Sequence, residues 1–402
     1  MVRTVRRTYE ETHPWLTFKL DMRNAPVLLW ALLGEARSKI EHIAQSPLKP
    51  DVAEELHEVF LAKGILSTTA IEGNTLSEDD ARQLVAGTLH LPPSRQYLGI
   101  ELANILEAFN KIRRELIDGQ ELRLDPPTLK EYNRIVLQGL ELEEGVVPGE
   151  IRTHSVVVGQ YRAAPAEDCE YLLERLSEWL DTDFEPPDED FRLPWVILKA
   201  VMAHLYFVWI HPFGDGNGRT ARLMELHTLL AAGAPTPACH LLSNHYNLTR
   251  AEYHRQLHLA SSSQGGDPVP FIAYAVRGFV DGLRDQLSTI TEQQFKDRWE
   301  QYIYETFGDR RSQADQRRLE LALELSKQEK QFIHSSEIRL LSPNLTLAYA
   351  GTTRMVARDL NVLKEMGLVD LYADGWVTTR SYIIRAFLPR VAPTPPTGGR
   401  PT

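Results

Sequence analysis

The sequence has only two cysteines, Cys169 and Cys239, among its 402 residues. Two such residues provide neither a disulfide framework nor a cysteine-rich metal site, and their scarcity fits a reducing compartment. We also expect no apolar run long enough to cross a bilayer. The N-terminus, where Arg3, Arg6 and Arg7 precede two glutamates, lacks the apolar core of a signal peptide. These absences predict a cytoplasmic protein without a membrane partner.

Positive charge is also scarce. The chain has 44 lysines and arginines against 55 aspartates and glutamates, which gives a formal net charge of −11 at pH 7. This balance argues against a chain that coats nucleic acid as a whole, although a local basic face is not excluded. The hydrophobic fraction, 43%, is that of an ordinary globular protein, and the length of 402 residues predicts two or three domains.

The most distinctive stretch runs from His211 to Arg222 and reads His-Pro-Phe-Gly-Asp-Gly-Asn-Gly-Arg-Thr-Ala-Arg. Its glycines allow backbone N–H groups to turn inward and form an anion-binding nest. A helical pattern of apolar residues follows from Thr220 to Leu230, so the nest opens a helix N-terminus, where phosphate is favoured. Arg219 and Arg222 project from one side of that helix and can hold different phosphates of one polyphosphate.

This stretch resembles the motif of the Fic family, HxFx(D/E)GNGRxxR, and matches it at every specified position. The resemblance implies transfer of AMP from ATP to a protein hydroxyl. It assigns His211 as the general base for a Ser, Thr or Tyr hydroxyl, and a neutral imidazole suits that task. It assigns Asp215 as the ligand of a Mg²⁺ ion that bridges phosphates, and Phe213 as a core residue that fixes the loop. The nucleotide-binding residues that it implies in this loop are Gly214, Gly216, Asn217, Gly218, Arg219 and Arg222.

A second motif lies in residues 67–74, which read Ser-Thr-Thr-Ala-Ile-Glu-Gly-Asn. It resembles the inhibitory motif (S/T)xxxE(G/N) of Fic proteins, with Thr68, Glu72 and Gly73 at the specified positions. A carboxylate beside Arg222 would form a bidentate pair and occupy the space that the γ-phosphate of ATP needs. The resemblance thus implies inhibition by an N-terminal helix of the same chain. A glutamate before Gly-Asn is also common in the last turn of an ordinary helix, which is the alternative.

Residues 148–159 differ from the helical text around them. The β-branched residues Val156, Val157 and Val158 are bounded by glycines, which predicts a β-hairpin. The segment resembles the flap of Fic proteins, a hairpin that covers the nucleotide and pairs with the target backbone, so Val157, Val158 and Gly159 are implied nucleotide contacts. Pairing at a strand edge would position a hydroxyl with little sequence specificity. The alternative is a short structural hairpin without a ligand.

Helical spacing elsewhere predicts a mainly α-helical chain, a Fic-type helical bundle with a β-hairpin flap. His204 lies two helical turns before His211, but no third metal ligand follows, which favours a core histidine. The predicted domains are an N-terminal helical region with the inhibitory motif (1–88), a Fic catalytic domain (89–285), a linker helix (286–312), a winged helix-turn-helix domain (313–390) and a disordered tail (391–402).

The predicted C-terminal domain reads helix, short helix, helix and hairpin. Its third helix, 352–366, holds Arg354, Arg358 and Lys364, and in a winged helix-turn-helix domain this helix would enter a major groove. Acidic and basic residues nearly balance, so tight DNA binding is not implied. Docking of a protein or formation of a homodimer is an equal alternative.

Three functions remain as candidates. The first is a protein adenylyltransferase that uses ATP and Mg²⁺, modifies a target protein or itself, and is inhibited by Glu72. The second is removal of AMP from a modified hydroxyl, alone or beside transfer, with Glu72 aligning a water molecule. The third is a DNA-binding regulator whose loop senses nucleotides.

Overall fold

The computed structural model describes residues 6–120, 123–159, 161–262, 266–328, 330–350 and 353–385. The chain is mainly α-helical with two small sheets, as predicted. It divides into two compact units, Met1–Ser288 and Thr289–Thr402, which are described separately. The predicted tail 391–402 lies outside the described residues.

The helices of the first unit are α1 (Thr8–Thr12), α2 (Val27–Gln45), α3 (Pro50–Ala70), α4 (Glu78–Val85), α5 (Gln96–Ile117), α6 (Pro126–Val136), α7 (Cys169–Thr182), α8 (Arg192–Ile210), α9 (Asn217–Ala231), α10 (Thr236–Cys239), α11 (Leu241–Leu248) and α12 (Arg250–Ser262). Short 3-10 turns are η1 (Pro93–Arg95), η2 (Ala166–Asp168) and η3 (Glu189–Phe191). Helix α13 (Val269–Phe307) begins in the first unit and ends in the second.

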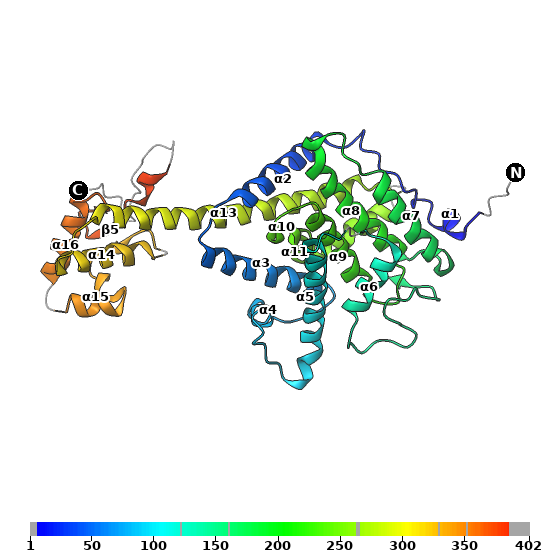
Figure 1. Cartoon of the computed structure of the whole chain (residues 1–402), viewed down its shortest axis with the longest axis horizontal. Helices are drawn as coiled ribbons and strands as arrows, with labels where there is room; N and C mark the ends of the chain where they lie inside the picture. Colours follow the sequence, from blue (N-terminus) through cyan, green and yellow to red (C-terminus); the bar gives the residue numbers. More distant parts are fainter. Residues whose placement is uncertain are drawn as a thin grey trace. The chain divides into compact units, whose positions relative to one another are not determined.

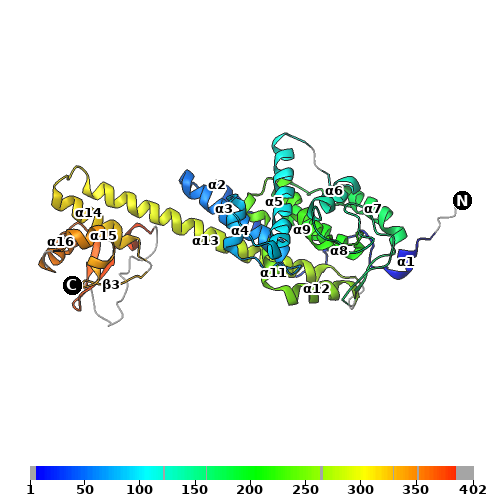
Figure 2. The same ribbon diagram turned by 90° about the horizontal axis from the view of Figure 1, so that it is seen from below.

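Helices α8 and α9 pack against each other in the middle of the first unit, with α3 and α5 on one side and α6 and α7 on the other (Figures 1 and 2). In α8, 14 of the 19 residues are buried. A helix that is apolar on all faces belongs in the core of a protein or in a membrane. This pair therefore anchors the stretch that joins the two helices, residues 211–216, in the best-packed part of the unit.

Residues 189–210 contradict the expectation that no run could cross a membrane. The segment Glu189–Ile210 is long and apolar enough by length and composition, with a mean hydropathy of 1.6. In the structure, 78% of its most apolar window is buried inside the protein. The burial is that of a core helix, because α8 is covered by the helices around it.

The motif helix α9 begins at Asn217 rather than at Thr220. Gly216 caps it with φ +75°, a left-handed conformation that glycine adopts without strain. The apolar pattern could not show this start, because it begins only after the polar first turn. Gly218 and Arg219 consequently lie in the first helical turn instead of in a loop.

The predicted hairpin is displaced toward the C-terminus. Strand β1 (Val157–Val158) pairs antiparallel with β2 (Tyr161–Arg162), so the second strand lies beyond the predicted segment 148–159. The earlier residues instead lead to the motif loop, where Ile151 forms an isolated antiparallel bridge with Phe213. The side chains of β1 are exposed, so this short hairpin offers a free apolar surface.

The second unit follows the predicted order of helix, short helix, helix and hairpin. Its elements are α14 (Gln313–Ser326), β3 (Ile333–His334), η4 (Ile338–Leu340), α15 (Pro343–Ala348), α16 (Thr353–Glu365), β4 (Val369–Leu371), β5 (Trp376–Thr379) and η5 (Ser381–Ile384). The strands form an antiparallel sheet in the order β3-β5-β4. Buried Asp359 on α16 accepts hydrogen bonds from Arg317 and Arg318 of α14 at 2.7 and 2.8 Å. These bonds tie the third helix to the first.

Candidate active site

His211 is the first residue after α8, where the chain reverses direction. Its φ and ψ of 51° and 59° are left-handed, which is uncommon for a residue other than glycine and marks a constrained position. The residue as a whole is partly exposed, but Nδ1 of its ring is buried. Burial of the imidazole, followed by the charge of Arg152, lowers the pKa of His211 to about 4. The imidazole is thus neutral at pH 7 and free to accept a proton.

Asn217 fixes the loop by bonding to both backbone groups of Phe213. Its Oδ1 accepts from the Phe213 N–H at 3.0 Å, and its Nδ2 donates to the Phe213 carbonyl at 2.9 Å. Phe213 is 1% exposed, which confirms that it points into the core. Because each end of the Asn217 amide already makes one of these bonds, its contact with a phosphate stays a prediction.

Asn133 of α6 supports the same loop, although no motif in the sequence includes this residue. Its Nδ2 donates to the carbonyl of Asp215 at 2.8 Å, and its Oδ1 accepts from the Gly149 N–H at 2.9 Å. A Cβ atom at Gly216 would lie 2.9 Å from this Nδ2, and one at Gly214 would lie 2.9 Å from Val146. Both glycines are therefore required by close approach.

The start of α9 keeps its anion-binding character. Within the described ranges, the N–H groups of Asn217 and Gly218 have no acceptor, whereas the Gly216 N–H is bonded to the Asp215 side chain. The first N–H groups of a helix lack partners inside the helix and carry the positive end of its dipole. This end of α9 consequently has the donors that a phosphate would need.

The carboxylate of Glu72 lies against this helix start. Its Oε1 is 2.2 Å from the position that a Cβ atom would take at Gly218, and 2.5 Å from Nη2 of Arg222. The Arg222 side chain is fully buried. Although burial opposes ionisation of Glu72, the charge and hydrogen bond of Arg222 lower the pKa of this carboxyl group below its ordinary value. An ionised carboxylate thus occupies the anion site.

The other residues of the inhibitory motif have backbone roles. The Thr68 carbonyl accepts from Arg222 Nη2 at 2.8 Å, while the Thr68 hydroxyl donates to the Gly64 carbonyl. Gly73 has φ +105°, which lets the chain turn directly after Glu72. The predicted bidentate pair is wrong in detail, because a single nitrogen of Arg222 serves both Glu72 and Thr68.

Arg219 is held by two acids. Its Nη1 donates to Glu101 and its Nη2 to Asp215, each at 3.1 Å. Glu101 on α5 also accepts from Asn74 Nδ2 at 2.8 Å, which connects Arg219 to the turn that carries Glu72. Sequence analysis missed Glu101, because a single acid on an amphipathic helix is ordinary and no motif includes it.

Both motif arginines keep unused donors. Nε and Nη1 of Arg222 and Nε of Arg219 are buried without a hydrogen-bond partner among the described residues. Leaving a buried donor unpaired costs about 1 to 3 kcal/mol. A polyphosphate would supply the missing acceptors, as guanidinium groups bind phosphate oxygens well.

Asp215 is the residue available for a metal ion. Its side chain is half exposed, and Oδ1 accepts from the Gly216 N–H and from Arg219. Within the described residues there is no group of three or more His, Cys, Asp or Glu residues that could hold a metal. Mg²⁺ commonly binds through one or two carboxylates together with substrate phosphates, so the site fits an ion that arrives with a nucleotide.

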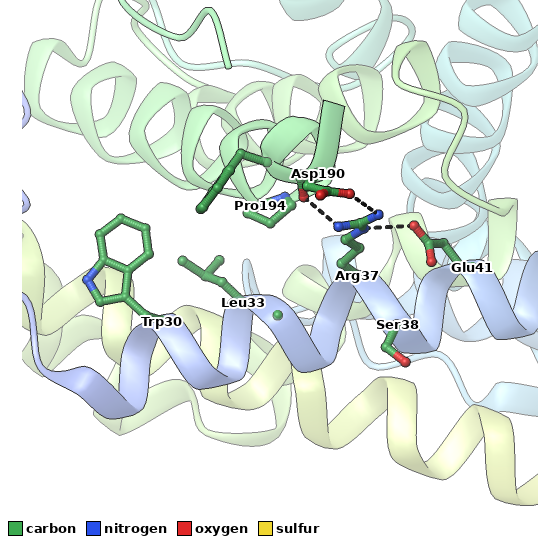
Figure 3. Close-up of a pocket in the computed structure, with 9 residues that line it drawn as sticks. Trp30, Leu33, Arg37, Ser38, Glu41, Asp190 and Pro194 are labelled. Carbon is green, nitrogen blue, oxygen red and sulfur yellow. Dashed lines mark hydrogen bonds and ion pairs between the residues drawn. The ribbon is translucent and has the colours of Figure 1, made fainter. Parts of the chain in front are cut away.

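A separate cavity of about 510 Å³ lies between α2 and the start of α8 (Figure 3). Trp30, Leu33 and Pro194 line it, and Arg37 pairs there with Glu41 at 2.9 Å and Asp190 at 2.8 Å. No residue of the motif loop borders this cavity. Its one basic residue, Arg37, is already paired with two acids, so the cavity lacks free positive charge for a nucleotide.

His204 is fully buried and bonds through Nε2 to the hydroxyl of Tyr253 at 2.9 Å. Its Nδ1 lies 3.2 Å from buried Glu225. These partners confirm the prediction of a core histidine.

The model of the Fic/DOC family matches residues 123–229 of this chain. The matched interval contains the hairpin, α8, the loop with His211, and all but the last two residues of α9. This interval is therefore similar to the Fic domain of the Fic/DOC family. The turn with Glu72 lies before the matched interval, so its assignment rests on the contacts described above.

Curated relatives include protein adenylyltransferase fic-1 of Caenorhabditis briggsae, 30% identical over 246 residues, which are 60% of this chain and 44% of the relative. Protein adenylyltransferase Fic of Nematostella vectensis is 29% identical over 213 residues, 53% of this chain and 45% of the relative. The chain thus spans less than half the length of these relatives.

Solved structures support the Fic fold. A Fic family protein from Desulfovibrio desulfuricans gives a TM-score of 0.53 at 19% identity and covers 90% of this chain and 97% of its own. A fragment of Fic-1 from C. elegans gives a TM-score of 0.52 at 23% sequence identity. The match covers 66% of this chain and 73% of that fragment. At these identities the likeness concerns the fold alone.

Proposed function

We propose that the chain is a protein adenylyltransferase that moves AMP from ATP to a Ser, Thr or Tyr hydroxyl of a target protein or of itself. One observation carries the proposal. A neutral His211 stands beside a helix start whose free N–H groups and two buried arginines form a polyphosphate site. The names of the curated relatives agree with this activity.

In this proposal the reaction is an in-line displacement. His211 accepts the hydroxyl proton as the hydroxyl oxygen attacks the α-phosphorus. The new P–O bond forms while the bond from the α-phosphorus to the bridging oxygen breaks, and pyrophosphate leaves. Arg219, Arg222 and the first N–H groups of α9 hold the phosphate oxygens. A Mg²⁺ ion at Asp215, when bound, would neutralise phosphate charge.

Self-inhibition by Glu72 belongs to the same proposal. Its carboxylate lies against Gly218 and takes the Arg222 Nη2 donor, which a terminal phosphate would need. Two anions cannot share this position without strong repulsion. Activation therefore requires Glu72 to leave Arg222.

The test uses ATP labelled at the α-phosphate, with mass spectrometry to detect an added AMP. We expect Glu72→Gly to raise labelling over the wild type, and the double change Glu72→Gly with His211→Ala to abolish it. Equal labelling in all three proteins would refute the proposal.

Removal of AMP is the second candidate, because the ionised Glu72 acts electrostatically on His211 and could align a water molecule between them. The test supplies a target that already carries AMP. Under this alternative, Glu72→Gly abolishes release of AMP instead of increasing transfer.

We propose that the second unit is a winged helix-turn-helix domain that binds either DNA or a protein, including a second copy of the chain. Arg354 and Arg358 are exposed on α16. A mobility shift with duplex DNA separates the candidates, since loss of binding in Arg354→Ala supports DNA. If the chain binds no DNA but light scattering shows a dimer, the homodimer is supported.

We also propose a cytoplasmic location, because both cysteines are free and buried thiols.

A further inference from the structure

Arg152 lies between the hairpin and the motif loop. Its backbone N–H donates to the Pro212 carbonyl at 3.0 Å, beside the bridge between Ile151 and Phe213. Its Nε donates to the His211 carbonyl at 2.8 Å. The residue is only 4% exposed, so these bonds form away from solvent.

The rest of the guanidinium group binds the two sides of the hairpin. Nη1 donates to the carbonyl of His154, before β1, at 2.6 Å. Nη2 donates to the carbonyl of Ala164, after β2, and contacts Cys169 Sγ at 3.5 Å. One planar group thus holds three carbonyls that belong to three different segments.

Among the described residues, no acid compensates the charge of Arg152 within ion-pair distance. The other buried arginines, Arg219 and Arg222, are each paired with an acid. Burying an unpaired charge is costly, and the three carbonyl dipoles only partly offset that cost. A charge that stays buried without an ion-pair partner, despite this cost, is expected where the group serves a function.

We propose that Arg152 is a positioning residue that locks the hairpin and the left-handed backbone of His211 to each other. A target hydroxyl presented along β1 then meets the imidazole at a fixed distance. This inference rests on the proposed transfer, and its structural part can be measured without any nucleotide.

Arg152 also acts on His211 electrostatically. Its positive charge disfavours the imidazolium, whereas Glu72 and Asp215 favour it. The two roles separate by substitution. Lysine keeps the charge but cannot reach three carbonyls with a planar fork, whereas glutamine keeps part of the hydrogen bonding and removes the charge.

The experiment compares Arg152→Lys, Arg152→Gln and the exposed control Arg23→Gln, each with and without Glu72→Gly. Among the residues that the structure describes, Arg23 is bonded to Asp21 alone, at the surface, so its loss should leave the site unchanged. Hydrogen exchange is measured on the peptide 153–164, which includes the bond from the Ala163 N–H to the Val156 carbonyl. The titration of His211 is followed by NMR with labelled histidine and assigned by its loss in His211→Asn.

We expect both Arg152 variants to exchange faster in this peptide, and only Arg152→Gln to raise the pKa of His211, by about 0.5 to 1 unit. In the Glu72→Gly background, both should lower kcat by about 10- to 100-fold with a smaller change in the KM for ATP, because misplacement of reacting groups acts on the chemical step. Wild-type exchange in both variants, or a loss confined to KM, would overturn the inference.

Absence of transfer in every protein, with faster exchange in the Arg152 variants, would sink the proposed function and leave the structural role intact. If Arg152→Gln does not fold, Arg152→Lys carries the exchange test alone. Unchanged exchange in Arg152→Lys would then overturn the inference.

Discussion

Glu72 is an ionised carboxylate in contact with a fully buried guanidinium. Because its folded pKa lies below the ordinary value of 4.5, the pair is fully formed above that value and is lost only as the pH falls through the lower, folded one. Acidification from pH 8 to 5.5 should therefore not release the proposed inhibition. The measurement is the ratio of labelling rates of Glu72→Gly and wild type over this range. A ratio that falls toward one at pH 5.5 would contradict the argument.

For His211, burial favours the neutral form of the imidazole. A base works when it is deprotonated, and its lowered pKa of about 4 keeps it deprotonated well below the ordinary value of 6.5. We expect kcat/KM of Glu72→Gly to show no inflection between pH 5.5 and 7.5, since this quantity reports the free enzyme. If kcat/KM instead falls tenfold for each pH unit below a midpoint near 6.5, the imidazole titrates like one exposed to solvent.

Helix α5 contributes a second acid to the site through Glu101. A glutamine at position 101 has one side-chain oxygen, which can accept from either Arg219 or Asn74. Its amide nitrogen would then face the other of these two donors, and that hydrogen bond would be lost. The Asn74 turn would loosen, so Glu101→Gln should raise labelling above the wild type and below Glu72→Gly. The matched control is Glu107→Gln, an exposed change on the same helix. Labelling at or below the wild type in Glu101→Gln would contradict this prediction.

The sequence located the elements of the site better than their ends. The motif predicted that a helix follows the glycines, but Gly216 as its cap, and not the apolar pattern, determines the start at Asn217. The hairpin was placed too early because β-branched residues mark strands without showing their partners. Ile151 has such a side chain, yet it pairs with Phe213 in the motif loop.

The sequence predicts a contact between two distant residues only where both belong to a motif. Glu72 and Arg222 belong to two motifs, so their pairing was predicted, although not its single-nitrogen geometry. Glu101 and Asn133 reach the loop from neighbouring helices and carry no local signal. Arg152 lies inside the predicted hairpin, but only the fold shows that its side chain turns back to the loop.

Over the whole chain, two cores are separate: one around α8 and α9, and one that includes Trp299, Leu321 and Val377. The proposed polyphosphate site and all the groups that we assign to it lie in the first unit. The effect of a bound nucleotide on thermal unfolding should therefore be read from the unfolding of that unit, for instance by the fluorescence change that accompanies it.

Thermal unfolding with different nucleotides would test where Glu72 competes. If its carboxylate takes only the place of the terminal phosphate, then Mg-ADP should stabilise the wild type and Glu72→Gly equally, and Mg-ATP should stabilise Glu72→Gly more. Binding at 100 times Kd contributes about 2.7 kcal/mol, so a tenfold difference in affinity for ATP alone is measurable as a shift in Tm. Arg222→Ala, which removes the shared partner, should abolish the difference between the two nucleotides. A larger shift in Glu72→Gly with both nucleotides would show that Glu72 obstructs the whole site, because its contact with Gly218 would then exclude the inner phosphates as well.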